Sequence, residues 1–253
     1  VFDVWSRSLK VPLWKFFGAK TVPLFSDITV VIGSLEEARD FARVYARRGF
    51  TTFKVKVGKD HDLDLARVTA VRESAPRARI IIDANQGFDA RRMLLFLKDL
   101  KARAIVPCLV EQPVARDDWE GLRQVTRAAA RSGILVCADE SVGSLADAVR
   151  AVRTKAVSAI NVKFMKSGIL EAEAIARVAR AAGLELMIGA MMESSLGVTA
   201  SAHMAAGMGC FRFIDLDTTY FLKGAFARSP YLDGKGRFDL SRVRCGIGVE
   251  VRL

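Results

Sequence analysis

Charged side chains close six apolar runs of the sequence at nearly regular intervals. The six residues are Lys56, Asp83, Glu111, Asp139, Lys163 and Asp215. They are 27, 28, 28, 24 and 52 residues apart, so the last step alone skips a run, the one that ends near Gly189. An apolar run followed by a helical pattern recurs at this interval, which is typical of successive βα units around a parallel sheet. If the sheet closes into a barrel, the C-terminal ends of its strands meet at one mouth, and we expect all six side chains there.

These residue types could perform proton transfer beside a metal ion. Asp83, Glu111 and Asp139 would come from three adjacent strands. They would supply hard oxygen ligands, which suit Mg²⁺ completed by water and substrate oxygens. Lys56 precedes the carboxylates and Lys163 follows them, so a substrate held on the metal would have one amine on each side.

Neighbouring polar residues extend this predicted site. Lys54 shares a strand face with Lys56 because side chains alternate along a strand. A second ammonium group beside Lys56 lowers the pKa of a lysine that acts as a base. Asn85 and Asn161 each lie two residues from a predicted ligand or base and are expected to support it on the inner face. Ordinary turn polarity is the alternative for these two asparagines.

Each charged residue taken singly has a simpler explanation. A carboxylate at a strand end is more often a helix N-cap or a surface residue than a metal ligand, and a buried lysine usually pairs with an acid. Six such residues in phase with the unit repeat favour one shared site. Other catalytic groups are scarce, since His61 and His203 are far apart and the four cysteines form no C-x-x-C pair. We expect these cysteines to be inert thiols.

The apolar runs predict eight strands, over residues 27–32, 53–57, 78–83, 108–112, 134–139, 159–163, 184–189 and 211–217. Ser34 and Glu37 match the S-x-x-E capping box of a helix start, and Gly49 would end that helix. Eight short βα repeats with no glycine-rich phosphate loop favour an α/β fold of the closed TIM type over an open doubly wound sheet. The length of 253 residues is that of one such barrel.

Composition excludes several classes of protein. With 51% hydrophobic and 26% charged residues, the chain can bury a sizeable core. The net charge of +11 would attract polyanions, but the arginines are spread over separate predicted helices without interleaved aromatic residues. No apolar run approaches the roughly 20 residues of a membrane span, and no signal segment opens the chain. We therefore expect a cytoplasmic protein with no nucleic-acid and no membrane partner. A homo-oligomeric assembly is compatible with the sequence.

The motifs around the charged residues resemble the enolase superfamily, in particular the muconate-lactonizing subgroup and, within it, the dipeptide epimerases. They are K-x-K-V-G at 54–58, IDANQGF around Asp83, VEQPV around Glu111, ADES around Asp139 and INVKFMKSG around Lys163. The resemblance implies a (β/α)7β barrel and one Mg²⁺ ion held by the three carboxylates. It makes Lys56 and Lys163 an acid/base pair on opposite faces of the substrate's α-carbon, with Lys54 helping to neutralise the substrate carboxylate. Proton removal beside a carboxylate creates an ene-diolate dianion, which metal and lysine stabilise.

Residues 187–207 and 211–223 resemble dipeptide epimerases in particular. In that family the pair Asp215 and Asp217 holds the free α-ammonium group of a dipeptide; a strand-end cap with a salt bridge is the simpler explanation. The resemblance implies inversion of the C-terminal residue of a dipeptide, with Ala-Glu as the default substrate. An N-acylamino-acid racemase or a cycloisomerase would use the same metal and lysines without an ammonium site. A catalytically silent barrel is the non-enzyme alternative.

The resemblance also concerns domain organisation. Family members carry an N-terminal α+β capping domain that closes over the barrel mouth, and no such region precedes Val1. We expect residues 1–253 to be the barrel domain alone. A helix and turn over 1–24 would lead into it, and 211–253 would hold the last strand and the C-terminal segment. Met187, Met191 and Met192 are expected in the barrel core or the pocket wall.

Overall fold

A parallel barrel is the central feature of the computed structural model, which describes residues 1–223 and 229–251. Eight strands lie side by side in sequence order. They are β2 (Ile28–Val30), β3 (Thr52–Lys56), β4 (Arg79–Asp83), β5 (Leu109–Glu111), β6 (Leu135–Ala138), β7 (Ala159–Val162), β8 (Glu185–Gly189) and β9 (Phe213–Asp215). Each overlaps one of the strands predicted from the apolar runs, and the barrel prediction is confirmed.

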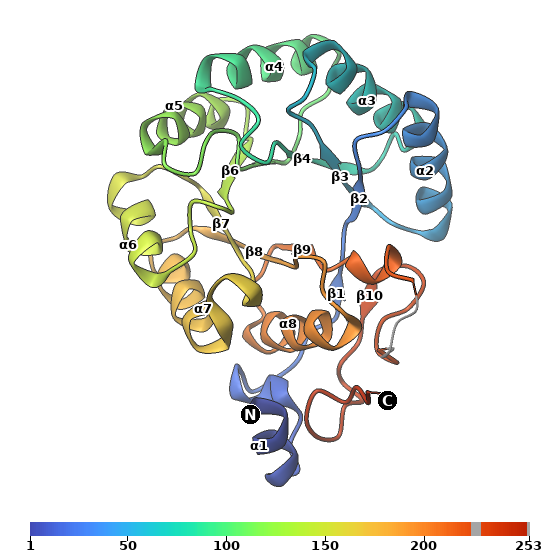
Figure 1. Ribbon diagram of the computed structural model, residues 1–253, viewed down its shortest axis with the longest axis vertical. Helices are drawn as coiled ribbons and strands as arrows, with labels where there is room; N and C mark the ends of the chain where they lie inside the picture. The colour runs from blue at the N-terminus through green and yellow to red at the C-terminus, as the bar shows by residue number, and fades with distance from the viewer. Residues whose placement is uncertain (224–228, 252–253) are drawn as a thin grey trace.

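Helices follow the first seven of these strands and form a ring around them (Figure 1). They are α2 (Leu35–Arg48), α3 (His61–Ser74), α4 (Ala90–Ala102), α5 (Trp119–Ala130), α6 (Leu145–Thr154), α7 (Phe164–Ala181) and α8 (Ser195–Met208). A short 3-10 turn, η2 (Thr218–Tyr220), follows β9 instead. The described residues therefore show the (β/α)7β arrangement, in which each crossover buries one face of a helix against the sheet.

Local capping sets where the helices begin. The Ser34 side chain accepts a hydrogen bond from Glu37 N at 3.1 Å, and the Glu37 carboxylate accepts one from Ser34 N at 2.8 Å. Gly49 ends α2 with a φ of 101°, which a residue with a Cβ rarely adopts. The predicted capping box and helix end are therefore confirmed. Aspartate side chains cap three further helices in the same way, namely Asp60, Asp89 and Asp118.

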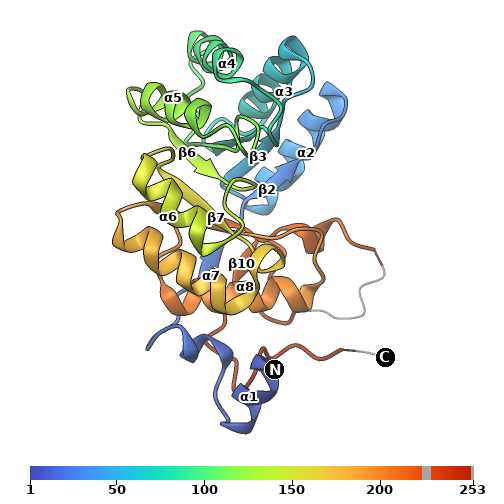
Figure 2. The same ribbon diagram turned by 60° about the vertical axis from the view of Figure 1, so that its left-hand side comes forward.

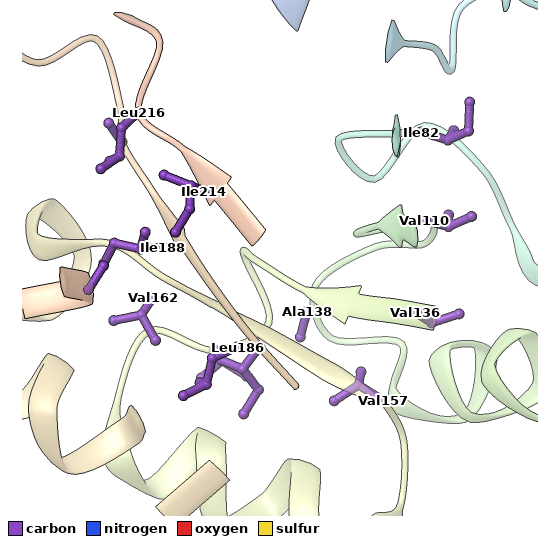
Figure 3. Close-up of a cluster of buried hydrophobic side chains, with 14 of the residues drawn as sticks. Ile82, Val110, Val136, Ala138, Val157, Val162, Leu186, Ile188, Ile214 and Leu216 are labelled. Atoms are coloured by element: carbon purple, nitrogen blue, oxygen red, sulfur yellow. The ribbon is translucent and has the colours of Figure 1, made fainter. Parts of the chain in front are cut away.

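The strands bury apolar side chains on both faces, as expected for a parallel sheet covered by helices. Outward-facing residues such as Ile82, Val110 and Ile188 pack against the helices (Figure 3). A separate inner layer fills the barrel below its mouth and consists of Ile81, Leu109, Cys137, Ala159, Met187 and Phe213. Because side chains alternate along each strand, the next inward position toward the C-terminal end lies above this apolar floor.

The N-terminal and C-terminal segments pack together outside the ring, beside α8 (Figures 1 and 2). They include α1 (Phe2–Ser8), η1 (Leu13–Phe16) and the antiparallel pair β1 (Leu24–Phe25) and β10 (Arg237–Phe238). Buried His203 joins them to α8, because its Nδ1 accepts from Trp14 N and its Nε2 lies 3.0 Å from Ile247 O. No helix of the described ranges is long and apolar enough to cross a membrane.

The barrel closes between β2 and β9 through three hydrogen bonds, two of which use side chains. They run from Asp27 N to Ile214 O at 2.8 Å, from Leu216 N to Ser26 Oγ at 2.9 Å, and from Thr29 N to Asp217 Oδ2 at 2.6 Å. This seam joins strands about 190 residues apart in the sequence, at the mouth where the polar strand ends meet.

We predict that Ser26→Ala destabilises the barrel more than Ser34→Ala. The first change leaves the buried Leu216 N–H without an acceptor, which costs about 1–3 kcal/mol. The second removes an exposed helix cap, which costs about 1 kcal/mol. Urea unfolding followed by circular dichroism measures both. A smaller loss for Ser26→Ala would contradict this description of the seam.

Candidate active site

Strand register brings the charged strand ends together. Lys56 lies beside Asp83 and Asp83 lies beside Glu111 in the parallel ladder, so these three charged side chains share one level. On β6 the residue beside Glu111 is Cys137, and Asp139 follows two residues later. These side chains surround a cavity of about 370 Å³ at the mouth. Eight of the ten predicted site residues line it, namely Lys54, Lys56, Asp83, Asn85, Asp139, Lys163, Asp215 and Asp217. Glu111 and Asn161 are fully buried against them.

Lys54 lies at the centre of the carboxylates. Its Nζ is 2.7 Å from Asp215 Oδ2, 2.8 Å from Glu111 Oε2 and 3.2 Å from Asp83 Oδ2. Burial acts to lower the pKa of this lysine, but the three carboxylates, Asp215 foremost, raise it well above its usual value. Lys54 is therefore a permanent buried cation, suited to hold negative charge and unsuited to accept a proton.

Lys56 and Lys163 reach the cavity from different sides. Lys56 Nζ is 2.8 Å from Asp83 Oδ2 on β4, and Lys163 Nζ is 2.7 Å from Asp139 Oδ2 beyond β6. Burial opposes the charge of Lys163, yet Asp139 and Glu111 raise the pKa of its ammonium group above the usual value. A lysine paired in this way holds its proton, and neutralising the carboxylates beside it would make it a better base.

The three predicted ligand carboxylates differ in how well they are paired. Lysines hold the pKa of Asp139 well below its usual range despite burial, whereas burial raises the pKa of Glu111 to about 7. Glu111 Oε1 accepts a hydrogen bond from Asn161 Nδ2 at 2.7 Å. Its Oε2 is buried and accepts no hydrogen bond of good geometry from the described residues, although Lys54 Nζ lies nearby.

This donor set fits a Mg²⁺ ion. Carboxylate oxygens are the ligands that this ion prefers. Buried carboxylates also outnumber buried ammonium groups at the mouth, so a divalent cation would reduce the excess negative charge. The oxygens of Asp83, Glu111 and Asp139 do not all lie within 4.8 Å of one another; among the described residues, a group that does is Asp27, Asp215 and Asp217.

Asp215 and Asp217 are nearly inaccessible, at 4% and 2% exposure. Asp215 forms its salt bridge with Lys54, and Asp217 accepts the hydrogen bond from Thr29 N. Burial and then the charge of Asp215 raise the pKa of Asp217 to about 7. The salt bridge of the simpler explanation is present, whereas the Asp217 side chain does not cap the turn that follows it. Both side chains also line the cavity.

Two supporting residues were missed from the sequence. Lys166 Nζ donates to Asp139 Oδ1 at 2.8 Å and to the carbonyls of Asp139 and Asn161. Gln112 Oε1 accepts from the backbone N–H groups of Asp139 and Ser141. Both lie inside motifs already singled out, since Gln112 follows Glu111 and Lys166 lies one helical turn after Lys163. That adjacency was the available signal.

Gly189 explains why the C-terminal end of β8 places no charged side chain at the mouth. A Cβ at this position would lie 2.6 Å from Asn161 Oδ1 and 2.8 Å from Lys163 Cε. Glycine therefore leaves the space that these two side chains occupy. Just beyond it, Met191 and Met192 form part of the cavity wall, whereas Met187 is buried in the inner layer.

Comparison with known proteins covers nearly the whole chain. The profile of the family described as "Enolase C-terminal domain-like" matches residues 36–253. The hydrophobic dipeptide epimerase of Citrifermentans bemidjiense is 58% identical over 100% of this chain and 70% of its own length. The chain spans 55 to 70% of the length of the curated relatives that it matches.

Two solved structures are similar throughout. A mandelate racemase/muconate lactonizing enzyme from Roseiflexus sp. has a TM-score of 0.95 and 45% identity, over 100% of this chain and 72% of its own. A dipeptide epimerase from Enterococcus faecalis, complexed with Mg and the dipeptide L-Leu-L-Tyr, has a TM-score of 0.90 and 33% identity, over 98% of this chain and 70% of its own. The matching family profile, the sequence identities and the shared barrel lead to one conclusion: the chain belongs to the enolase C-terminal domain-like family.

Proposed function

We propose that this chain is the catalytic barrel of a Mg²⁺-dependent dipeptide epimerase that inverts the α-carbon of the C-terminal residue. One observation carries the proposal: two lysines face one cavity from different sides, and an acidic pair lines the same cavity. The names of the similar proteins support the same reaction. In this proposal Asp83, Glu111 and Asp139 are the metal ligands.

The lysines divide the proton transfer between them. One removes the α-proton as a neutral amine, which leaves an ene-diolate, and the other donates a proton to the opposite face as an ammonium group. Lys54 faces the negative charge that develops on the substrate carboxylate. A bound Mg²⁺ would supply further positive charge to that carboxylate and would offset the three acidic side chains. Lys166 and Gln112 hold the Asp139 loop so that Lys163 keeps its direction.

We further propose that the substrates carry apolar side chains, in place of the Ala-Glu default. The described part of the cavity wall contains no arginine, and its lysines are all paired with carboxylates. Val31, Met191 and Met192 form an apolar rim and are 56%, 38% and 67% exposed. A glutamate side chain would meet no free cation there, whereas an apolar side chain would bury these residues.

An N-acylamino-acid racemase is the nearest rival, because it would need the same lysines and the same metal ligands. An acylated substrate carries no cation, and a wall formed by Asp215 and Asp217 would then be unfavourable. The buried acidic pair therefore favours a substrate with a free ammonium group.

Glu111→Gln is predicted to lower Mg²⁺ affinity and turnover together, by at least about tenfold. The change keeps the shape of the side chain and removes one charge from the proposed ligand set. Glu140→Gln is the matched control, since Glu140 lines the same cavity and is not a proposed ligand. Calorimetric titration with Mg²⁺ measures both variants. Equal Mg²⁺ affinity in Glu111→Gln and the unmutated protein would disprove the ligand assignment.

Lys163→Ala is predicted to abolish epimerisation, while exchange of the α-proton of one epimer survives through Lys56. Each base faces one side of the α-carbon, so removing it blocks one direction of proton transfer. NMR in D₂O follows the exchange of each epimer separately. Lys59→Ala, at an exposed lysine just beyond β3, serves as the control. Near-normal epimerisation by Lys163→Ala would rule out the two-base mechanism.

The KM for a free dipeptide is predicted to rise as pH falls below about 7, by up to about tenfold per pH unit. An ammonium group binds the ionised form of Asp217, whose pKa is raised to about 7 by burial and by Asp215. As pH falls through that value, the carboxylate takes up a proton and the attraction is lost. The KM for an N-acetylated dipeptide should depend less on pH, because only Glu111 among the site carboxylates with a pKa of about 7 would then act, through the metal. Equal pH dependence for the two substrates would contradict the role given to Asp217.

A further inference from the structure

Asp27 is a buried carboxylate that the mechanism has not used. It is 1% exposed, and neither of its carboxylate oxygens accepts a hydrogen bond from the described residues. Asp27 immediately precedes β2 and lies two residues before Thr29, which lines the cavity, so both side chains point to the interior. Burying a carboxylate without a hydrogen-bond partner destabilises the fold, so such groups are usually satisfied by water, an ion or a ligand.

Asp27 lies at the barrel seam, where its backbone N–H donates a hydrogen bond to Ile214 O. This bond places it beside the strand that carries the acidic pair. One carboxylate oxygen from each of Asp27, Asp215 and Asp217 lies within 4.8 Å of the other two. Burial foremost, and then the charges of Asp215 and Asp217, raise the pKa of Asp27 well above its usual value. The ionisation of each of these three carboxylates therefore depends on the charge of the other two.

The spacing of these oxygens matches a primary ammonium group. Three N–H donors directed tetrahedrally at acceptors about 2.8 Å away would place those acceptors about 4.6 Å apart. An ammonium group has three such donors and no acceptor. Two carboxylates leave one donor of a buried ammonium group without an anionic partner, whereas three can satisfy all of them.

We propose that Asp27 is the third carboxylate of the ammonium site, so that Asp27, Asp215 and Asp217 together receive the three N–H donors of the substrate's α-ammonium group. The inference rests on the proposed dipeptide function and adds a residue to its binding site. Lys54 already pairs with one oxygen of Asp215, and Thr29 N already pairs with one oxygen of Asp217. Among the described residues, nothing donates a hydrogen bond to either oxygen of Asp27, so a bound ammonium group would compensate its burial most.

The test compares binding of a free dipeptide, such as Leu-Tyr, with its N-acetylated form by calorimetry, using the full-length protein with Mg²⁺. Asp27→Asn should weaken binding of the free dipeptide by about tenfold to a hundredfold, as expected for the loss of one charge-assisted hydrogen bond. It should change binding of the N-acetylated form less than about twofold. Kinetics should show the same loss as a raised KM for the free dipeptide, with kcat changed less.

Ser26→Ala is the matched control, because it weakens the same seam and keeps all three carboxylates. It should affect the two ligands equally. If Asp27→Asn also affects both ligands equally, Asp27 acts through the fold and the proposal is wrong. If Asp27→Asn lowers Mg²⁺ affinity and leaves dipeptide selectivity intact, the group is a metal site and the proposal is again wrong. If the unmutated protein itself does not prefer the free dipeptide, the proposed function fails instead.

Discussion

Carboxylate and ammonium groups crowd together inside the barrel mouth, largely shielded from solvent, and the charge of each group depends on its neighbours. Lys54 illustrates the constraint, because burial alone would favour its neutral form and the surrounding carboxylates reverse that preference. Asp139 stays ionised for the complementary reason, since Lys166 and Lys163 both contact it. Removing one member of such a group leaves a buried charge uncompensated, which is far costlier than losing a surface ion pair.

The barrel makes this crowding possible by repetition. Parallel pairing brings successive strand ends to one mouth, and the apolar inner layer beneath them excludes water from below. The residues just beyond two of these ends adopt left-handed backbone conformations, with φ of 40° at Asn85 and 35° at Gln112. Strained conformations of this kind persist where the surroundings determine them, here through side-chain hydrogen bonds to the neighbouring strand ends.

Much of this architecture could be predicted from local sequence patterns. The strands follow from apolar runs, the start of α2 from Ser34 and Glu37, and the shared mouth from the interval between charged strand ends. The position of Asp27 beside Asp215 and Asp217 could not be predicted, because it depends on closure between strands about 190 residues apart. Gln112 and Lys166 lie inside the recognised motifs, but their contacts with Asp139 depend on how the strand ends meet and could not be predicted from spacing alone.

Solvent deuterium incorporation tests the central claim most directly. The full-length protein with Mg²⁺ would be incubated in D₂O with a mixture of free dipeptides and their N-acetylated forms, and the mass of each compound would be followed. We predict a gain of one mass unit at the C-terminal residue of free dipeptides with apolar side chains, together with loss of their original configuration. Incorporation confined to the N-acetylated compounds, or into none of the mixture, would contradict it.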